Sequence, residues 1–483
     1  MGASFHIENF GCRAARADGE AIANRLLAAG HLPQQADDAD IVLVNTCSVT
    51  AEADREARAF IRRTHRLNPQ ARILATGCYA QRAPEELAGL AGVTAVVGNS
   101  HKALVPAIVL GLTQGPANSG ESPALVSAAS LLAGAGSPLV LADDTFAHSF
   151  LEEAQVVPGA QTRPNLKIQE GCGNRCSFCV IPQTRGASRS LSAGAILRQV
   201  EGFVAAGGNE LVFSGINLGR WGRDAAAIDT RVNGNPASLA SLVRRIFSTT
   251  DLPRLRLSSV EPMDWDAELI ALMAEFGGTR LARHAHLPLQ SGSDAVLRRM
   301  HRRYRPWHYA EKVAALVRAA GPALTLGADV MVGFPGETDA EFEDTLALVR
   351  ALPFGYLHIF PFSPRPATRA WALHRQNPVP ALAVDERLLV LRALAAEKTR
   401  AHRSRFLGSE LDAITLHTPA ALSAAGKTAA LTENFLPAEL AGNLPANSRV
   451  QLHVAGLSAN AALETAIAPS IRHSSESRPA VAV

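Results

Sequence analysis

A regular alternation of strand-like and helix-like segments between residues 165 and 362 constrains the fold of this chain most strongly. Consecutive parallel strands must be joined by a crossover, which is usually a helix, so the alternation predicts parallel strands. Six such strands form a curved or partly closed α/β barrel, a partial (β/α)6 barrel, whose ligands lie at the carboxyl ends of the strands. The strand candidates are NLKIQ, ELVFSG, RLRLSSV, HAHLPL, LTLGADVMV and YLHIFPF.

Two smaller regions flank this central part. Residues 1–105 show a βαβα pattern, which predicts a small parallel sheet. Beyond residue 403, short runs such as KTAALTEN and SRVQLHVAGL predict a small β-barrel. A segment rich in Gly, Ala, Ser and Pro predicts a linker or loosely packed insert, and the last residues predict a disordered tail. The expected division is an N-terminal domain (1–110), a linker or insert (111–157), a barrel (158–395), a small C-terminal barrel (404–467) and a tail (468–483).

The composition is typical of a globular protein, and the absence of targeting and membrane-spanning signals predicts a cytoplasmic one. Apolar residues make up 47% of the 483 residues and charged residues 19%, which excludes a disordered chain. The N-terminus lacks the basic and apolar regions of a signal peptide, and no apolar stretch is long enough to span a membrane. A net charge of +3 permits nucleic-acid binding without indicating it. In the cytosol cysteines stay reduced, so we expect the six cysteines to be metal ligands or catalytic groups.

Three of these cysteines lie together directly after the first barrel strand. Cys172, Cys176 and Cys179 follow NLKIQ with C-x3-C-x2-C spacing, in a loop that contains two glycines. Structural zinc sites usually have four protein ligands, whereas a cubane iron–sulfur cluster with three cysteine ligands keeps one iron open. We therefore expect a [4Fe–4S] cluster here. The alternatives are a zinc site completed by a distant histidine, or plain buried thiols.

The other three cysteines share one position relative to the predicted strands. Cys12, Cys47 and Cys78 each lie just past the carboxyl end of a strand in the N-terminal region. Because the carboxyl ends of parallel strands meet at one edge of a sheet, these three thiols can converge. The pattern predicts a second three-cysteine cluster site, and the alternative is three unrelated buried cysteines.

Together these features resemble the radical S-adenosylmethionine methylthiotransferases, a family of enzymes that contain two [4Fe–4S] clusters. The C-x3-C-x2-C loop after the first barrel strand resembles the signature of the wider radical S-adenosylmethionine superfamily. The resemblance covers nearly the whole chain outside residues 111–163, and it implies an N-terminal domain with an auxiliary cluster, a radical S-adenosylmethionine barrel and an RNA-binding TRAM barrel. It also implies that S-adenosylmethionine chelates the open iron of the barrel cluster and that the auxiliary cluster carries the sulfur.

Several motifs at the predicted strand ends carry this resemblance, namely SGINLGRWG, LSSVEP, HLPLQSGSDAVLRRMHRRY, DVMVGFPGETDAEF and FPFSPRPATRA. Trp221 replaces the usual tyrosine, and Ala367 replaces a glycine, which leaves the local turn open. Glu261 and Asp329 could instead cap helices, and Gln290 could simply form a turn. The resemblance implies that S-adenosylmethionine is bound by Phe178, Gly215, Asn217, Ser259, Glu261, Gln290 and Asp329.

Charged residues give two further expectations about RNA. The run Arg298, Arg299, Arg302 and Arg303 is either a solvated helix end or a contact to substrate phosphates. Between residues 403 and 464, four basic residues face five acidic ones, a net charge of −1. RNA-binding barrels are usually more basic, so this one would bind RNA by shape, with the phosphates contacted elsewhere.

Within the family, the segments NTCSVTAEADREAR, SGINLGRWGRD and RLRLSSVEP look most like the enzymes that act on N6-threonylcarbamoyladenosine. The implied reaction converts this nucleoside, at position 37 in the anticodon loop of tRNA, to its 2-methylthio derivative. It also needs an electron donor such as flavodoxin or ferredoxin, and a sulfur donor that the sequence does not identify. The alternatives within the family are isopentenyladenosine in tRNA and a ribosomal protein. Outside the family, the chain could be a radical enzyme with structural N-terminal cysteines, or a cluster-containing RNA-binding protein that senses redox state.

Overall fold

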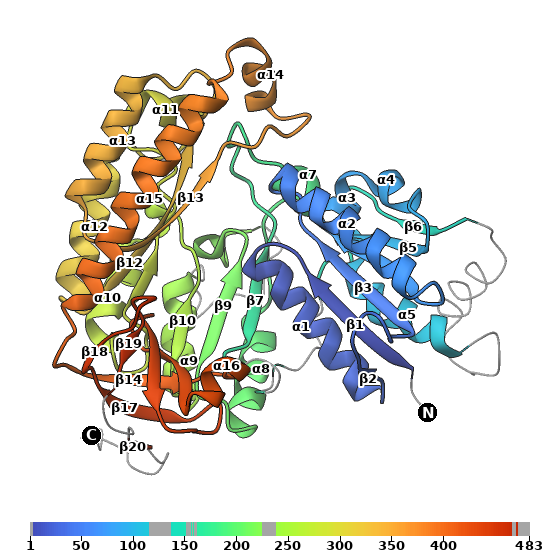
Figure 1. The fold of residues 1–483 in the computed structure, drawn as a ribbon, viewed down its shortest axis with the longest axis horizontal. Helices are drawn as coiled ribbons and strands as arrows, with labels where there is room; N and C mark the ends of the chain where they lie inside the picture. The colour runs from blue at the N-terminus through green and yellow to red at the C-terminus, as the bar shows by residue number, and fades with distance from the viewer. Residues whose placement is uncertain are drawn as a thin grey trace.

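The structure is a computed structural model that describes residues 3–114, 137–150, 156, 158, 162–224, 238–465 and 470–471. A six-stranded sheet from the N-terminal part lies beside a curved barrel from the middle of the chain, and a curled sheet from the C-terminal part lies at one end of that barrel (Figure 1). The predicted α/β class is therefore confirmed. Among the described residues, no helix is long and apolar enough to cross a membrane.

The N-terminal sheet is parallel throughout, with the strand order β2-β1-β3-β4-β5-β6. Its strands are β1 (Ser4–Asn9), β2 (Leu32–Pro33), β3 (Ile41–Thr46), β4 (Arg72–Gly77), β5 (Val93–Gly98) and β6 (Leu139–Leu141). Its helices are α1 (Arg13–Ala28), α2 (Ala51–Leu67), α3 (Cys78–Arg82), α4 (Pro84–Ala88) and α5 (Val105–Gln114). Helices α1 and α5 pack on one face, and α2, α3 and α4 pack on the other. Both faces are covered, which explains why β3 is apolar along almost its whole length.

The segment predicted as a linker contributes to this sheet, so that prediction needs a correction. Residues 139–141 form β6, which pairs in parallel with β5. The Leu-Val-Leu sequence of β6 can complete the sheet edge because its backbone hydrogen-bonds to β5 while its side chains pack on both layers. Nearby, Phe146 is buried. Residues 115–136, and the predicted tail apart from 470–471, lie outside the described residues.

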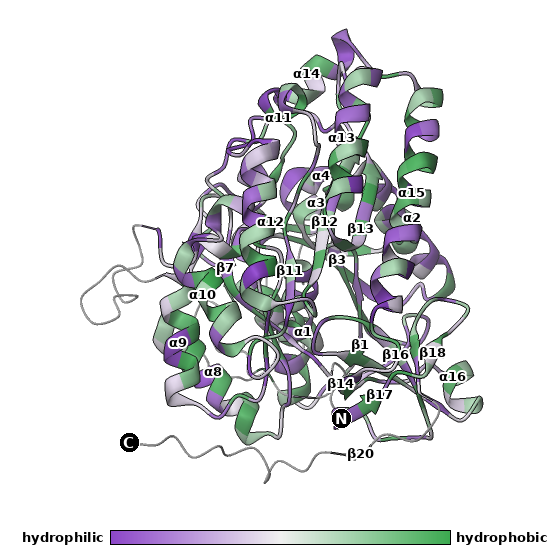
Figure 2. Ribbon diagram, turned by 90° about the vertical axis from the view of Figure 1, so that its left-hand side faces the viewer, coloured by the Kyte–Doolittle hydropathy of each residue, from purple (hydrophilic) through white to green (hydrophobic). Residues whose placement is uncertain are grey.

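The central region is the predicted partial barrel of six parallel strands. In spatial order they are β7 (Asn165–Glu170), β9 (Leu211–Gly215), β10 (Leu255–Leu257), β11 (His284–His286), β12 (Thr325–Val332) and β13 (Phe354–Pro361). Isolated bridges join the β10 and β11 segments, and a short antiparallel strand, β8 (Arg189–Ser190), lies beside β7. The main outer helices are α8 (Ala193–Ala205), α9 (Leu239–Thr249), α10 (Ala267–Phe276), α12 (Pro306–Ala320), α13 (Asp339–Ala351) and α15 (Ala381–Ser404). They carry both hydrophobic and hydrophilic segments (Figure 2), as expected for helices with one buried face.

The remaining short helices, α7 (Ile181–Arg185), α11 (Asp294–Arg299), α14 (Arg369–Gln376) and α16 (Ala420–Ala424), connect these elements. The C-terminal part is a curled sheet with the order β18-β19-β16-β15-β14-β17-β20. Three of its strands correspond to runs that the sequence predicts as strands: β14 (Glu410–Thr415) overlaps LDAITLHT, β15 (Lys427–Thr432) lies in KTAALTEN and β17 (Arg449–His453) lies in SRVQLHVAGL. The others are β16 (Pro437–Ala441), β18 (Gly456–Leu457), β19 (Leu463–Glu464) and β20 (Ser470–Ile471).

A buried carboxylate joins the barrel to this C-terminal sheet. Glu210 is fully buried before β9, and its Oε1 accepts from Arg256 Nε at 2.7 Å. Glu210 also pairs with Arg163 and Arg254, and Arg254 Nη2 reaches Asp412 Oδ1 at 2.9 Å. Burial by itself would raise the pKa of Glu210, but the arginines, led by Arg256, lower this pKa to about 2.

We expect the stability of the full chain to fall as the pH drops from about 4.5 toward 2. The folded-state pKa of Glu210 lies below its ordinary value of 4.5, so its ionised form stabilises the fold at neutral pH and this stabilisation is lost on protonation. A shift of this size corresponds to about 3 kcal/mol. The melting temperature of wild type and of Glu210→Gln is measured from pH 7 to pH 3. At pH 7 the variant should melt at a lower temperature than wild type, and its melting temperature should fall less steeply as the pH drops. Equal pH slopes for the two proteins would contradict this account.

Candidate functional site

The first cysteine trio lies in an irregular loop at the carboxyl end of β7. Cys172, Cys176 and Cys179 lie in this loop, which ends where α7 begins. Gly171 has a φ of +68°, and a Cβ at this position would approach the carbonyl oxygen of Ala187 to 2.0 Å. A side chain therefore cannot be accommodated here, and glycine lets the loop fold back tightly.

Hydrogen-bond donors from three directions point at the sulfur atoms of this loop. Asn217 Nδ2 lies 3.5 Å from Cys172 Sγ, and Arg302 Nη1 lies 3.3 Å from Cys176 Sγ. The backbone N–H of Ile181 donates to Cys179 Sγ at 3.5 Å. Burial raises the pKa of Cys179 to about 12, so the free thiol stays protonated. Iron coordination deprotonates a thiol outright, and the donors then stabilise the thiolate, so this set of groups fits an iron–sulfur cluster.

The second trio comes together as the strand-end pattern predicts. Cys12 lies just before α1, Cys47 just after β3, and Cys78 at the first position of α3, directly after β4. The strands β1, β3 and β4 are neighbours in the sheet. Burial, followed by the neighbouring sulfurs of Cys78 and Cys12, raises the pKa of Cys47 to about 12. Gly11 allows this close approach, because a Cβ there would lie 2.7 Å from Cys47 Sγ.

Cys78 is the point at which the two trios are linked. Its sulfur accepts from Arg185 Nε at 3.2 Å and from Asn99 Nδ2 at 3.4 Å. Arg185 ends α7, six residues after Cys179, and Asn99 also donates to the carbonyl oxygen of Thr184 at 2.8 Å. Helices α3 and α7 lie side by side at the contact between the N-terminal sheet and the barrel (Figure 1). The single turn of α7 therefore connects the first cysteine loop to a cysteine of the second trio.

A buried ionic network holds this connection. Arg185 Nη1 donates to Glu170 Oε1 at 2.8 Å, and Lys102 Nζ donates to Asp18 Oδ2 at 2.8 Å. Lys167 reaches Asp18 Oδ1 at 2.5 Å and also pairs with Glu170. These three cations and two carboxylates carry a net charge of +1, which the thiolate of Cys78 would neutralise. Sequence reasoning missed all five residues, because they lie on four elements that are distant along the chain.

The expected S-adenosylmethionine residues fall into two groups. Asn217, Glu261 and Phe178 lie close to the first trio: Asn217 contacts Cys172, Glu261 pairs with Arg302, and Phe178 lies in the cysteine loop itself. Gly215 lies two residues before Asn217 at the end of β9, against Gln169. Two side-chain oxygens in this region, Asn217 Oδ1 and Gln290 Oε1, are buried without a hydrogen-bond partner among the described residues. Such oxygens are costly unless a ligand satisfies them, so they are suited to bind one.

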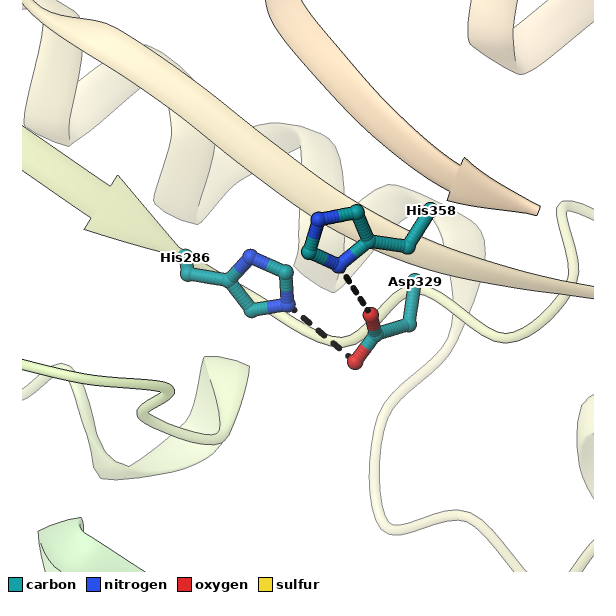
Figure 3. A group of neighbouring side chains, drawn as sticks. All are labelled: His286, Asp329 and His358. Atoms are coloured by element: carbon teal, nitrogen blue, oxygen red, sulfur yellow. Dashed lines mark hydrogen bonds and ion pairs between the residues drawn. The ribbon is translucent and has the colours of Figure 1, made fainter. Parts of the chain in front are cut away.

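Asp329 belongs to a different group, which it forms with His286 and His358 on three neighbouring barrel strands (Figure 3). Its Oδ2 lies 3.1 Å from His286 Nε2 and its Oδ1 lies 3.2 Å from His358 Nδ1. Burial would raise the pKa of Asp329, but the hydrogen bonds from both histidines hold this pKa well below its usual range. Ser259 forms an isolated parallel β-bridge with His286, and it lies two residues before Glu261. Ser259 is therefore placed between the two groups. The two histidines were not predicted, although each lies on a predicted barrel strand.

The four arginines expected to bind substrate do not form one surface. Arg302 is buried against Cys176 and Glu261 because it supports the first cysteine loop, which corrects the expectation of a solvated run. Arg299 pairs with Glu341 at 2.7 Å, and the exposed Arg298 pairs with Asp294 at 2.8 Å. Arg303 lines a hollow of about 530 Å³ together with Arg175, Arg220, Arg223, His301 and Asn217. This basic hollow beside the cysteine loop was not predicted.

The two departures from the expected motifs have local explanations. Ala367 adopts a φ of +62°, in the left-handed region that glycine favours, so the turn keeps its conformation. Trp221 is fully buried, and its Nε1 donates to the carbonyl oxygen of Leu191 at 2.9 Å. Both residues therefore serve the fold around the site.

Comparisons with known proteins agree with this geometry. Residues 4–98 match the Uncharacterized protein family UPF0004, and residues 166–349 match the Radical SAM superfamily. The chain is 32% identical to threonylcarbamoyladenosine tRNA methylthiotransferase MtaB of Aquifex aeolicus, over 89% of this chain and 94% of the relative. It is 34% identical to tRNA-2-methylthio-N(6)-dimethylallyladenosine synthase of Erythrobacter litoralis, over 86% and 87%. The radical S-adenosylmethionine methyltransferase TsrM of Kitasatospora setae shares the fold, with a TM-score of 0.53 and 15% identity over 77% of each chain.

Proposed function

The chain belongs to the radical S-adenosylmethionine methylthiotransferase family, and from this premise we propose that it converts N6-threonylcarbamoyladenosine at position 37 of tRNA to the 2-methylthio derivative. The observation that carries the proposal is the second cysteine trio, which lies next to the radical S-adenosylmethionine loop and is joined to it through α7. A radical enzyme that only cleaves S-adenosylmethionine needs one cluster. Two adjacent three-cysteine sites, each with one iron left open, fit a reaction that brings a radical and a sulfur atom to the same carbon.

The residues of the chain position the reactants. Cys172, Cys176 and Cys179 would hold the radical cluster, and the N-terminal trio of cysteines would hold the auxiliary one. With S-adenosylmethionine bound, these clusters supply a carbon radical that takes hydrogen from carbon 2 of adenine and the sulfur that replaces it, chemistry that side-chain acids and bases cannot perform. Asn217 and Glu261, beside the first trio, would orient the amino and carboxylate groups of S-adenosylmethionine, and Arg302 holds Glu261 in place.

The partners follow from this reaction. The anticodon loop of tRNA is the proposed substrate, and the basic hollow beside the cysteine loop is suited to its phosphates. The proposed TRAM barrel is the curled C-terminal sheet, which lies at the opposite end of the barrel strands from the cysteines. A flavodoxin or ferredoxin in the cytoplasm would supply the electron.

A second substrate, N6-dimethylallyladenosine in tRNA, is the alternative, because a relative that is 34% identical is named for it. The segments NTCSVTAEADREAR and SGINLGRWGRD favour threonylcarbamoyladenosine, whereas relatives of similar identity carry either name. The nucleosides of tRNA distinguish the two.

Deletion of the gene is expected to remove 2-methylthio-N6-threonylcarbamoyladenosine from tRNA and to leave its unmethylthiolated precursor in equal amount. The reason is that side-chain acids and bases cannot open the C–H bond at carbon 2, so without this radical enzyme the precursor stays unmodified there. Nucleoside mass spectrometry of total tRNA measures both species, and the wild-type gene supplied in trans should restore the product. Loss of the 2-methylthio-dimethylallyl nucleoside instead would select the alternative substrate, and an unchanged profile would reject both.

A further inference from the structure

An arginine that has no ion-pair partner in the described part of the chain enters the barrel from the N-terminal region. Arg13 follows Cys12 directly and begins α1, which packs beside β7 and β9. Its guanidinium carbon lies 5.4 Å from the centre of the Phe435 ring. Among the residues that the structure describes, no carboxylate ion-pairs with Arg13, whereas Arg256, whose guanidinium carbon lies 5.2 Å from the centre of the same ring, is paired with Glu210. Arg13 therefore brings a positive charge that no ion pair within the described part of the chain neutralises, since Glu210, whose charge acts on Arg13, is already shared by Arg163, Arg254 and Arg256.

Phe435 forms an aromatic floor beneath this charge. It adopts a φ of +69°, an unusual conformation for an aromatic residue, in a turn where Leu436 N donates to Thr432 Oγ1 at 2.8 Å. Arg256 Nη2 donates to two carbonyl oxygens of this turn, at 3.2 and 3.1 Å. The turn is thus held from both sides, and strained residues that are held in this way are concentrated at binding sites.

Polar side chains form the wall above this floor. Tyr356 lies 5.5 Å from Phe435 between ring centres, and its hydroxyl contacts His284 Nε2 at 2.8 Å and His286 Nδ1 at 3.0 Å. The group of Asp329 with its two histidines continues the wall toward the cysteines. His358 is 61% exposed although it lies in the middle of a barrel strand, so solvent reaches this inner face. The wall therefore offers accessible donors and acceptors beside the unpaired guanidinium.

We propose that Arg13 binds the carboxylate of the threonylcarbamoyl group on adenosine 37 and thereby selects this nucleoside over one with an apolar N6 substituent. This inference rests on the proposed function. The threonylcarbamoyl group carries one carboxylate, which a guanidinium binds through charge-assisted hydrogen bonds. A dimethylallyl group would leave Arg13 desolvated without an anion, which disfavours its binding.

The position of Arg13 agrees with the chemistry of the base. Carbon 2, which reacts, and carbon 6, which carries the N6 substituent, flank the same ring nitrogen of adenine. Arg13 is the neighbour of Cys12, a proposed ligand of the auxiliary cluster. An anchor adjacent to that ligand would hold the substituent while the ring stays close to the transferred sulfur.

The test compares wild type, Arg13→Gln, Arg13→Lys and Arg16→Gln, each as the full chain with reconstituted clusters. Arg16 is a matched control, since it is exposed on the next turn of α1. The probes are anticodon stem-loops that carry N6-threonylcarbamoyladenosine, unmodified adenosine or N6-dimethylallyladenosine at position 37. Equilibrium binding by fluorescence anisotropy is the first readout, and 2-methylthio product per 5′-deoxyadenosine formed is the second. Iron content and melting temperature identify any variant that fails to fold.

Wild type and Arg16→Gln should bind the threonylcarbamoyl loop about 10- to 100-fold more tightly than the unmodified loop, the ratio expected for a hydrogen-bonded charge pair. Arg13→Gln should lose most of this ratio while its affinity for the unmodified loop stays the same, and Arg13→Lys should keep part of it. An unchanged ratio in Arg13→Gln would overturn the inference, as would an equal loss of affinity for all three loops, which would indicate a phosphate contact. If wild type forms no 2-methylthio product from any loop, the proposed function itself fails. This outcome differs from an unchanged affinity ratio in Arg13→Gln, which would overturn only the role of Arg13.

Discussion

Cys78→Ala is expected to abolish methylthio transfer while the cleavage of S-adenosylmethionine to 5′-deoxyadenosine continues. Cys78 is one of the three cysteines proposed to hold the auxiliary cluster, and it is connected to α7, which follows the radical S-adenosylmethionine loop, through Arg185 and Asn99. With two cysteines left at this site, the cluster that carries the sulfur should not assemble stably. The iron content should drop from about eight to about four per chain, since each cubane holds four irons. Anaerobic reconstitution, followed by iron assay and product analysis, measures both effects.

The matched variant is Cys176→Ala, in the other trio. It should also leave about four irons per chain, but it should stop 5′-deoxyadenosine formation, because the radical cluster is the one lost. The two variants therefore have the same iron content and opposite cleavage activity. Eight irons in Cys78→Ala, or methylthio product from it, would contradict the assignment of the N-terminal trio.

Arg185→Met is expected to destabilise the protein by about 3 to 5 kcal/mol, the cost of removing one partner from a buried ion pair. Arg185 is fully buried, and without it Glu170 loses two hydrogen bonds while the net charge of the network falls to zero before any thiolate is counted. Cys78 also loses an N–H donor, which should make the reduction potential of the auxiliary cluster more negative. Denaturant unfolding of the full chain measures the first effect, and redox titration followed by electron paramagnetic resonance measures the second.

Arg244→Met is the control for this experiment. Arg244 forms an exposed ion pair with Glu275 at 2.6 Å, and exposed pairs contribute about 0 to 1 kcal/mol. The reduction potential of the auxiliary cluster in this variant should equal that in wild type, because Arg244 lies in α9, on the outer surface of the barrel. Equal stability of the Arg185 and Arg244 variants would show that the network does not hold the two cysteine sites together.

The parts of the site that could be predicted are those that follow local rules. Cys172, Cys176 and Cys179 are close in the chain, so their spacing alone indicates a shared ligand. Cys12, Cys47 and Cys78 are far apart, but each follows a parallel strand, and such strand ends meet wherever the sheet forms. The alternation of short apolar runs with longer amphipathic runs likewise predicts the barrel strands and the helices between them. A buried parallel strand is apolar on both faces, which gives the short apolar runs.

The parts that could not be predicted depend on contacts between regions. The edge strand β6 is only three residues long and follows a segment of low complexity, so no periodicity distinguishes it from a linker. The arginines near residue 300 look equivalent in the sequence, yet one supports a cysteine and another lines a hollow. Which of these occurs depends on how α11 and its following turn pack against the cysteine loop.

The sequence by itself determined the barrel strands and the two cysteine trios, because periodicity and spacing act over a few residues and strand ends meet by topology, and the resemblance of its motifs indicated the family. Only the tertiary structure decided which side chains connect the two cysteine trios and which ones line the barrel beside them. Arg185 meets Cys78, and Arg13 meets Phe435, across 107 and 422 residues of chain. Such meetings depend on how three regions pack together, since a buried charge finds its partner through the free energy of the whole assembly.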